Sequence, residues 1–203
     1  RNFDINPFNY ALNTSRALRA YDSNGEREYY TLNFAPFNIL EELDNNYIKL
    51  NVIDLKAQAE FNWQIFKGLK YNFTGAIRYV RSKQEHEIHE NSNMANAYRA
   101  AGNSTIRENN PYLYKDPSDP SAEPIVVLSK GGFYNTAENL LLNYDIRNSV
   151  SFSKIWNEKH EFNALLGQQI KYSDRQTNSN TGYGFQYDMG GTVSMNYLIM
   201  KQM

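Results

Sequence analysis

The sequence predicts an all-β fold, in which an antiparallel sheet forms part of a transmembrane β-barrel. Residues 53–65 alternate without exception between apolar and polar side chains, and successive side chains of a strand point to opposite faces of a sheet. The alternating stretches are more than twice as long as an ordinary strand of about 5 to 6 residues. Short turns also alternate with long loops, as periplasmic turns and extracellular loops do in outer-membrane barrels.

Composition narrows the classes of protein that fit. The 21 Lys and Arg residues nearly balance the 22 Asp and Glu residues, so no charge excess favours nucleic acid as a partner. The chain has no Cys, which excludes disulfides and thiolate metal sites. It holds 16 Tyr, 11 Phe and 27 Asn, residues typical of strands and loops. No run approaches the roughly 18 apolar residues of a spanning helix, whereas a spanning strand needs only about 10.

The first regular element follows a long opening segment. Residues 1–46 lack a sustained period and are expected to be an irregular excursion. The alternation breaks at Lys67-Gly68 and then resumes, with apolar residues at the odd positions from Tyr71 onward. We therefore expect a β-hairpin over about 51–80, with its turn at Gly68.

A second hairpin is expected over about 139–173. Apolar residues occupy even positions on either side of a turn near Asn157, and Asn148 is the exception between Leu140 and Phe152. The segment between the hairpins, about 82–138, contains NNPYLYKDPSDPSAEP, whose four prolines exclude a regular central strand. Residues 173–192 are polar and rich in Gly, and we expect another loop there.

The alternation assigns the side chains of both hairpins to two faces. In a barrel wall the apolar face meets lipid and the polar face lines a wet lumen, while neighbouring strands pair every backbone group. The candidate lipid-facing residues are Ile53, Leu55, Phe61, Trp63, Ile65, Phe73, Ile77, Leu142, Tyr144, Ile146, Phe152, Phe162, Leu166 and Ile170. The candidate lumen-facing residues are Lys56, Gln58, Glu60, Asn62, Arg78, Asp145, Arg147 and Lys171.

No residue pattern indicates catalysis. The stretch EHEIHE at 85–90 has metal-binding residue types, but on a strand His86 and His89 would point to opposite faces. A solvated charge run is the simpler interpretation. His160 lies beside a predicted turn, and no G-x-S-x-G motif accompanies it. We expect no enzymatic activity, no cofactor and no bound metal.

Four phrases resemble one family of membrane proteins. They are NPFNYALNTSRALRAYDSNG (6–25), FNILEELDN (37–45), FKGLKYNFTGAIRY (66–79) and NEKHEFNALLGQQIKYS (157–173). They resemble the barrel of the SusC/RagA-type TonB-linked outer-membrane transporters of Bacteroidetes. The resemblance extends over most of the chain, except the variable loop near 84–135.

The resemblance implies a larger protein, a barrel of about 22 strands occluded by an N-terminal plug. Such transporters take up oligosaccharides or peptides across the Gram-negative outer membrane, with energy relayed by TonB and usually with a SusD-like lid lipoprotein. None of the family's plug or energy-coupling motifs occurs in residues 1–203. Four or five strands cannot close a barrel, so we expect this chain to be an internal segment of one barrel domain, without the plug and the remaining strands.

In such an importer, exposed aromatic faces in the loops are candidate contacts for ligand or lid protein. The alternative is that these rings pack among the loops themselves. The candidates are Tyr98, Tyr112, Tyr114, Phe133 and Tyr134.

A second interpretation of the same pattern remains open. A soluble or surface-anchored β-rich module, with carbohydrate as a ligand, shows the same alternation when one face of its sheet is solvated. Such a module packs its apolar faces together and stays monodisperse without detergent. A barrel segment instead exposes several hundred Å² or more of apolar surface.

Overall fold

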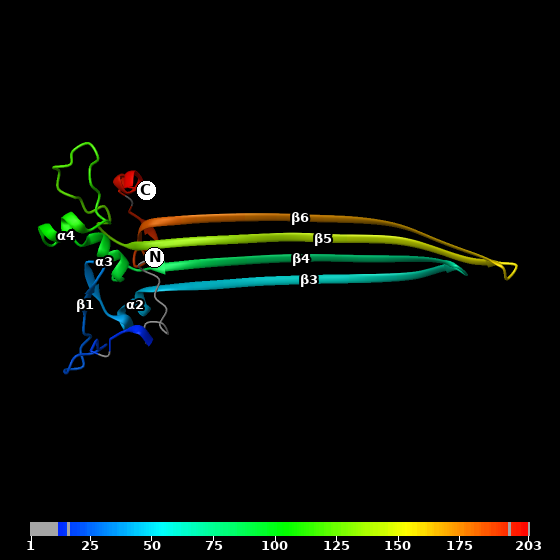
Figure 1. Cartoon of the computed structure of the whole chain (residues 1–203), viewed down its shortest axis with the longest axis horizontal. Helices are drawn as coiled ribbons and strands as arrows, with labels where there is room; N and C mark the ends of the chain where they lie inside the picture. The colour runs from blue at the N-terminus through cyan, green and yellow to red at the C-terminus, as the bar shows by residue number, and fades with distance from the viewer. Residues whose placement is uncertain (1–11, 16, 195, 203) are drawn as a thin grey trace. The chain divides into compact units, whose positions relative to one another are not determined.

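The structure is a computed structural model that describes residues 12–15, 17–194 and 196–202. It is mostly β-sheet, and its main sheet is antiparallel and curled into a half-barrel. The strands follow one another in chain order, side by side (Figure 1). The all-β prediction is therefore confirmed. The strands of this sheet are β3 (Asn46–Phe66), β4 (Leu69–Ile88), β5 (Gly132–Trp156), β6 (His160–Gln186) and β7 (Thr192–Val193).

Both predicted hairpins form, but their strands are longer than predicted. The first hairpin extends past 51–80 at both ends, and the second extends well past 139–173. The predicted loops shrink accordingly, because β4 continues to Ile88 and β6 continues to Gln186. The stretch 173–192, predicted as a loop, is therefore mostly strand. Residues 173–181 are polar on both faces, so this part of the sequence lacks the alternation that marks a half-buried strand.

The two hairpin turns are tight. Lys67 and Gly68 link β3 to β4, and Gly68 has φ +94°, a left-handed conformation that favours glycine. A Cβ on Gly68 would lie 2.3 Å from the Ser153 carbonyl oxygen of β5, so the position also has no room for a side chain. Asn157 and Glu158 have φ of 51° and 54° in the other turn. The predicted turns at Gly68 and near Asn157 are confirmed.

Side-chain contacts fix the faces of β5 and β6. Counting twelve residues outward from Trp156 and from His160 reaches Tyr144 and Tyr172, and their rings stack with centroids 4.9 Å apart. Asn139 accepts a hydrogen bond from the Thr177 hydroxyl at 2.9 Å in the same register. The sequence alone leaves the pairing of β5 with β6 uncertain by two residues, and these contacts fix it.

The chain divides into two compact units, which are described separately. We call Leu50–Gln84 with Ala137–Ser179 the strand unit, and the described residues of the remaining ranges the loop unit. The loop unit contains the two-stranded sheet β1 (Tyr30–Leu32) and β2 (Ala35–Phe37) together with four short helices. These helices are α2 (Ile39–Asn45), α3 (Asn93–Arg99), α4 (Ser104–Asn109) and α5 (Tyr197–Gln202).

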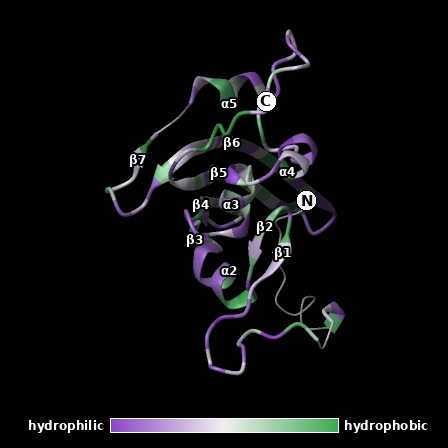
Figure 2. Cartoon of the chain, turned by 90° about the vertical axis from the view of Figure 1, so that its left-hand side faces the viewer, coloured by the Kyte–Doolittle hydropathy of each residue, from purple (hydrophilic) through white to green (hydrophobic). Residues whose placement is uncertain are grey.

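The loop unit has a hydrophobic core of its own. Helix α3 packs against β2, and the two lie side by side in the view along the strands (Figure 2). The buried side chains are aliphatic or aromatic, and they pack closely between the short elements. They are Ala35, Phe37, Ile88, Ala95, Ala97, Leu113, Tyr114, Val127, Leu128 and Phe133.

Polar side chains hold the short helices of the loop unit in place. Asn38 caps α2 by accepting hydrogen bonds from the Leu40 and Glu41 backbone N–H groups. Glu42, 3% exposed, accepts a hydrogen bond of 2.6 Å from the backbone N–H of Asn93 at the start of α3. Buried polar groups need hydrogen-bond partners, and the bond between Glu42 and Asn93 links α2 to α3. In the described part of the chain, no helix is long and apolar enough to cross a bilayer.

The strand unit has no core. None of its residues is buried, although its strands carry the longest apolar series of the chain. Leu55 is 62% exposed, Trp63 is 54% exposed and Leu166 is 77% exposed. The edge of β3 opposite β4 faces no other described strand, and β7 pairs only with Phe185 and Gln186 of β6.

Candidate functional site

The candidate site lies on the polar face of the strand unit, to which all four long strands contribute. Arg78 of β4 forms a bidentate ion pair with Asp54 of β3, with Nη2 to Oδ2 at 2.6 Å and Nε to Oδ1 at 3.0 Å. On β5 and β6, Asp145 accepts two hydrogen bonds from the Gln169 amide at 2.9 and 3.0 Å. The four strands therefore present one continuous polar surface.

A hollow of about 340 Å³ opens on this face. Four predicted lumen-facing residues line it, one from each long strand: Lys56, Arg78, Asp145 and Lys171. Small neighbours make the hollow, because Ala76 and Ser173 leave space between the longer charged side chains. The structure thus gathers half of the predicted lumen-facing set at one place.

A second hollow of about 340 Å³ lies along the same strands. Gly167 leaves it open, because the position has no side chain and its nearest neighbours across the strand are 3.6 Å or more from where a Cβ would stand. Apart from Gly167, its lining is polar, with one charged residue, Arg147, and six uncharged ones: Asn72, Thr74, Asn148, Ser149, Gln168 and Gln169. This hollow offers hydrogen-bond donors and acceptors but little charge.

The remaining three predicted lumen-facing residues lie elsewhere on β3. Gln58, Glu60 and Asn62 are exposed, and neither hollow includes them. The Asn62 amide donates to the Glu60 carboxylate at 3.1 Å. They share the face of Lys56 through the period of two residues but form no common site with it.

The predicted lipid-facing residues all lie in the strand unit, and none is buried. Eleven of the fourteen are exposed, whereas Phe73, Ile146 and Phe152 are half-buried. The exposed ones form an apolar surface without a partner in the described chain. They are Ile53, Leu55, Phe61, Trp63, Ile65, Ile77, Leu142, Tyr144, Phe162, Leu166 and Ile170.

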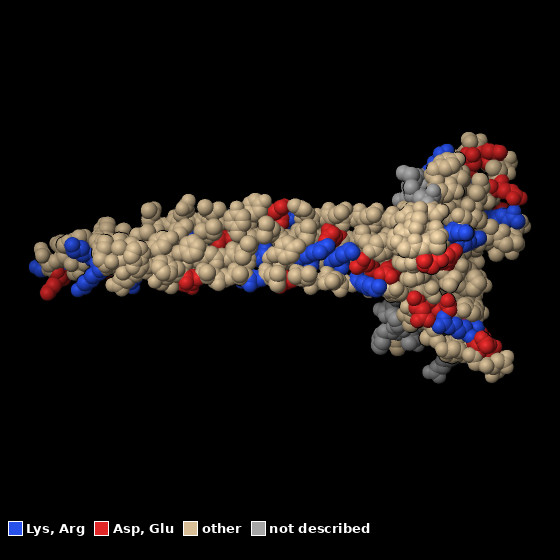
Figure 3. Space-filling view, turned by 180° about the vertical axis from the view of Figure 1, so that it is seen from behind, with Lys and Arg blue, Asp and Glu red and all other residues tan. Residues whose placement is uncertain are grey.

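Charged side chains are unevenly spread along the strands. Figure 3 shows one face of the molecule, where Lys and Arg side chains group at the hairpin turns and again farther along the strands, with mostly uncharged surface between the two groups. At the turn end, Lys154 Nζ lies 5.0 Å from the centre of the Trp156 ring. This cation–π contact keeps the lysine on the same side as the apolar residues of β5.

The predicted loop aromatics pack mainly with one another. Phe133 is 1% exposed and Tyr114 is 7% exposed, so the prediction that they contact a ligand or a lid is wrong, and both are core residues. Tyr98 stacks on Tyr112 with ring centroids 4.9 Å apart. Burial raises the pKa of the Tyr98 hydroxyl, to which Tyr183 and Tyr112 add. Tyr134 stacks on Phe185 at 4.8 Å, and Tyr98, Tyr112 and Tyr134 are half-buried.

Near the start of β3 and the end of β4, the Glu87 carboxylate and its partners form a polar cluster. One of the two histidines of EHEIHE, His89, lies in this cluster. Glu87 accepts hydrogen bonds from Lys49 at 2.7 Å and from Tyr47 at 2.8 Å. Burial raises the pKa of Glu87, but these hydrogen bonds lower it by more, so the pKa lies below its usual value. His89 stacks on Tyr187 at 3.9 Å, whereas His86 lies 2.6 Å from Asn46 Oδ1. Among the described residues, no three His, Cys, Asp or Glu side chains converge on a metal site.

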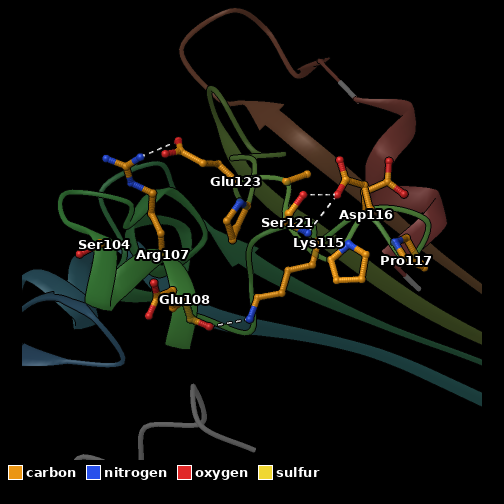
Figure 4. A pocket seen from close by; sticks show the side chains of 12 residues that line it. Ser104, Arg107, Glu108, Lys115, Asp116, Pro117, Ser121 and Glu123 are labelled. Atoms are coloured by element: carbon orange, nitrogen blue, oxygen red, sulfur yellow. Dashed lines mark hydrogen bonds and ion pairs between the residues drawn. The ribbon is translucent and has the colours of Figure 1, made fainter.

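Another hollow, of about 620 Å³, lies in the proline-rich loop (Figure 4). Asp116 and Asp119 each accept hydrogen bonds from the backbone and hydroxyl of the serine two residues later, and these bonds hold the pKa of both carboxyls below the usual range. The cations here are engaged, since Arg107 pairs with Glu123 at 2.8 Å and Lys115 donates to a backbone carbonyl at 2.5 Å. The hollow has two cations, Arg107 and Lys115, against four carboxylates in its lining, and the loop itself already binds both cations.

The arrangement on the polar face suits recognition of a polar solute more than chemistry. Sequence reasoning missed Asp54, Asn143 and Ser173, which complete the surface around the first hollow. Asp54 and Asn143 follow the parity of the other polar residues, so the alternation itself could have found them. Ser173 lies in the stretch 173–192, which the sequence predicts to be a loop, so the alternation gave it no face.

No protein-family model matches the chain, and no curated protein matches it significantly. Residues 6–11, which begin the first of the four phrases that resemble SusC/RagA-type transporters, lie outside the described residues.

Proposed function

We propose that this chain is part of the wall of an outer-membrane β-barrel that imports polar solutes, a transporter of the SusC/RagA type. One observation carries the proposal: the strand unit has no buried residue, yet one of its faces displays a long apolar series. Contiguous apolar surface of this extent marks a contact with lipid or with protein. Side chains of a barrel wall behave in this way, with apolar residues toward lipid and polar residues toward the lumen.

Three further features support a membrane barrel over a soluble sheet. Strands of 20 to 27 residues exceed those of ordinary sandwiches by far. The turns at Gly68 and Asn157 are short, whereas the connection between β4 and β5 is long and folded. The open edge of β3 needs further strands, because lipid does not tolerate unpaired backbone groups.

The proposal gives each part a role. In the parent barrel of about 22 strands, the apolar face contacts outer-membrane lipid and the polar face lines the path of the solute. The loop unit lies on the extracellular side, where a SusD-like lipoprotein would bind, and TonB would supply energy through the plug. The substrate is an oligosaccharide or a peptide. The chain itself carries out no catalysis in this scheme.

Cysteine accessibility tests this proposal directly, because the chain has no Cys of its own. Single cysteines replace four neighbouring residues of β3, namely Asp54, Leu55, Gln58 and Phe61, in the full-length protein. In intact outer membranes a charged maleimide should label positions 54 and 58 and leave positions 55 and 61 unlabelled. After solubilisation and unfolding in urea, all four should react equally, which controls for expression. Labelling of all four in membranes, or recovery of the protein from the soluble fraction, favours the β-rich soluble module instead.

A further inference from the structure

We propose that the first hollow of the polar face is a subsite for solutes that carry two or more carboxylate groups. This inference rests on the proposed function and names the substrate class of the same wall. The hollow has three cations in its lining, Lys56, Arg78 and Lys171, against one carboxylate, Asp145. Including Asp54 and Arg147, which pair with lining residues, four cations stand against two carboxylates.

This local excess of positive charge does not follow from the chain as a whole. The net charge of the 203 residues is −1, so a region with two positive charges in excess departs from the average composition. Arg175 adds to the excess, because it follows Lys171 by four residues on β6 and therefore shares its face. A wet groove lined by one sign of charge concentrates counter-ions of the opposite sign.

Two of the cations are available to a solute. Arg78 is held by the bidentate pair with Asp54. Lys56 has no carboxylate within ion-pair distance in the part of the chain that is described, and Lys171 lies 3.9 Å from Asp145, which Arg147 and Gln169 already bind. The larger hollow of the proline-rich loop differs, since its own carboxylate and carbonyl oxygens already bind its Arg and Lys.

Geometry selects for more than one carboxylate. Lys56 is on β3 and Lys171 is on β6, with two strands between them. At about 4.8 Å per strand the backbones at these positions are about 14 Å apart along the sheet, so one small anion cannot satisfy both ammonium groups. A short acidic oligosaccharide or acidic peptide can place one carboxylate at each. The amide and hydroxyl groups of Asn143 and Ser173 suit the uncharged part of such a solute.

The test compares charged and neutral probes on the full-length protein purified from outer membranes. The probes are trigalacturonate and maltotriose for sugars, and triglutamate and trialanine for peptides, with affinity measured by isothermal titration calorimetry. The groove variant is Lys56→Gln with Lys171→Gln. The matched control is Lys67→Gln with Lys159→Gln, which removes two lysines from the exposed hairpin turns.

We expect at least one acidic probe to bind more tightly than its neutral counterpart, and the groove variant to weaken that binding about fivefold or more. The control should bind as the wild type does, and the preference for the acidic probe should fall as salt rises. The pair of acidic probes decides whether sugar or peptide carries the carboxylates. Equal binding of charged and neutral probes, or equal losses in both lysine variants, would overturn the inference.

The cysteine labelling pattern separates this inference from the proposed function. If positions 54 and 58 are labelled in membranes and 55 and 61 are not, a failure of the binding test overturns the acidic subsite alone. If that pattern is absent, the barrel wall is wrong, and the subsite fails with it. A charge-reversed variant, Lys56→Glu with Lys171→Glu, keeps the test sensitive and should abolish the preference for acidic probes.

Discussion

The Tyr71 hydroxyl donates a hydrogen bond of 2.6 Å to Asn148 Oδ1, and both residues lie on the apolar face of the strand unit. Asn148 is the one polar residue in the apolar series of β5 that starts at Leu140 and reaches Phe152. The contact across β4 and β5 explains how this exception is tolerated, because a polar group away from water needs a partner.

The pair should behave as a unit on mutation. Tyr71→Phe leaves the Asn148 amide oxygen without its donor and should lower the free energy of unfolding by about 1–3 kcal/mol. Tyr71→Phe combined with Asn148→Leu removes both polar groups and should recover most of that loss. Urea titrations of the full-length protein in detergent micelles measure the cycle. Strictly additive effects would show that the contact contributes nothing to stability.

The turn at Gly68 should not accept any side chain. Gly68→Ala places a Cβ at φ +94° and against the Ser153 carbonyl oxygen, so we expect a loss of about 2–5 kcal/mol. Gly25→Ala is the control, because Gly25 has φ +83° but no atom within 4 Å of the position of a Cβ. It should cost only about 1–2 kcal/mol. The heat-dependent gel shift of the folded protein measures both, and equal melting temperatures would contradict the assigned turn.

Glu87 should make the stability of the loop unit depend on pH. Its pKa is below the usual value in the folded state, so its contribution is present above the unfolded pKa of about 4.3 and is lost as pH falls through the folded pKa. Glu87→Gln should lower the free energy of local opening by about 1–2 kcal/mol at pH 7, and the difference should shrink as the pH falls through the folded pKa of Glu87.

Hydrogen exchange at residues 85–89, followed by mass spectrometry between pH 3 and pH 7, measures this difference. Glu90→Gln is a suitable control, because Glu90 is exposed and lies 3.6 Å from its nearest cation, Arg99. It should change local opening by less than about 0.5 kcal/mol. A gap between Glu87→Gln and the wild type that persists unchanged at pH 3 would exclude the carboxylate as its cause.

Asn110 should be the residue on which the loop after β4 depends most. It is fully buried, and its amide donates to the carbonyls of Ala97 and Ala100 at 2.8 and 2.9 Å while it accepts from the Tyr112 N–H at 3.0 Å. Asn110→Ala removes all three hydrogen bonds, of which the one to the Ala97 carbonyl is buried, and should cost about 2–4 kcal/mol. Asn109→Ala removes an exposed neighbour and should change stability by less than about 0.5 kcal/mol. Proteolysis rates of the loop in both variants measure the difference.

The strands of the main sheet could be predicted because one face of each strand is apolar and the other is polar. From Ile53 to Ile65 each apolar residue is followed by a polar one, so the period of two is unmistakable. The same logic found Lys56, Arg78, Asp145 and Lys171, which the structure brings to one hollow. The continuation of β6 past Ser173 could not be predicted, because residues 173–181 are polar on both faces and show no alternation.

The loop unit could not be predicted in the same way. Its helices are six or seven residues long, too short to show a helical period, and they are held by caps such as Asn38 and Asn103. The burial of Phe133 and Tyr114 depends on contacts between segments distant in sequence, which composition does not reveal. The hydrogen bond between Tyr71 and Asn148 could not be predicted for the same reason, because the two residues are 77 positions apart in the sequence.

The unpaired edge of β3 governs how this chain behaves when it is produced alone. The strand has 21 residues, and every second one directs its backbone N–H and C=O toward the open edge, beside a strongly apolar face. Such an edge pairs readily with the edge of another copy, and alternating chains of this kind assemble into cross-β fibrils. Refolding should therefore be limited by protein concentration, with a lag phase and thioflavin-positive aggregates, until detergent and the neighbouring strands are both supplied.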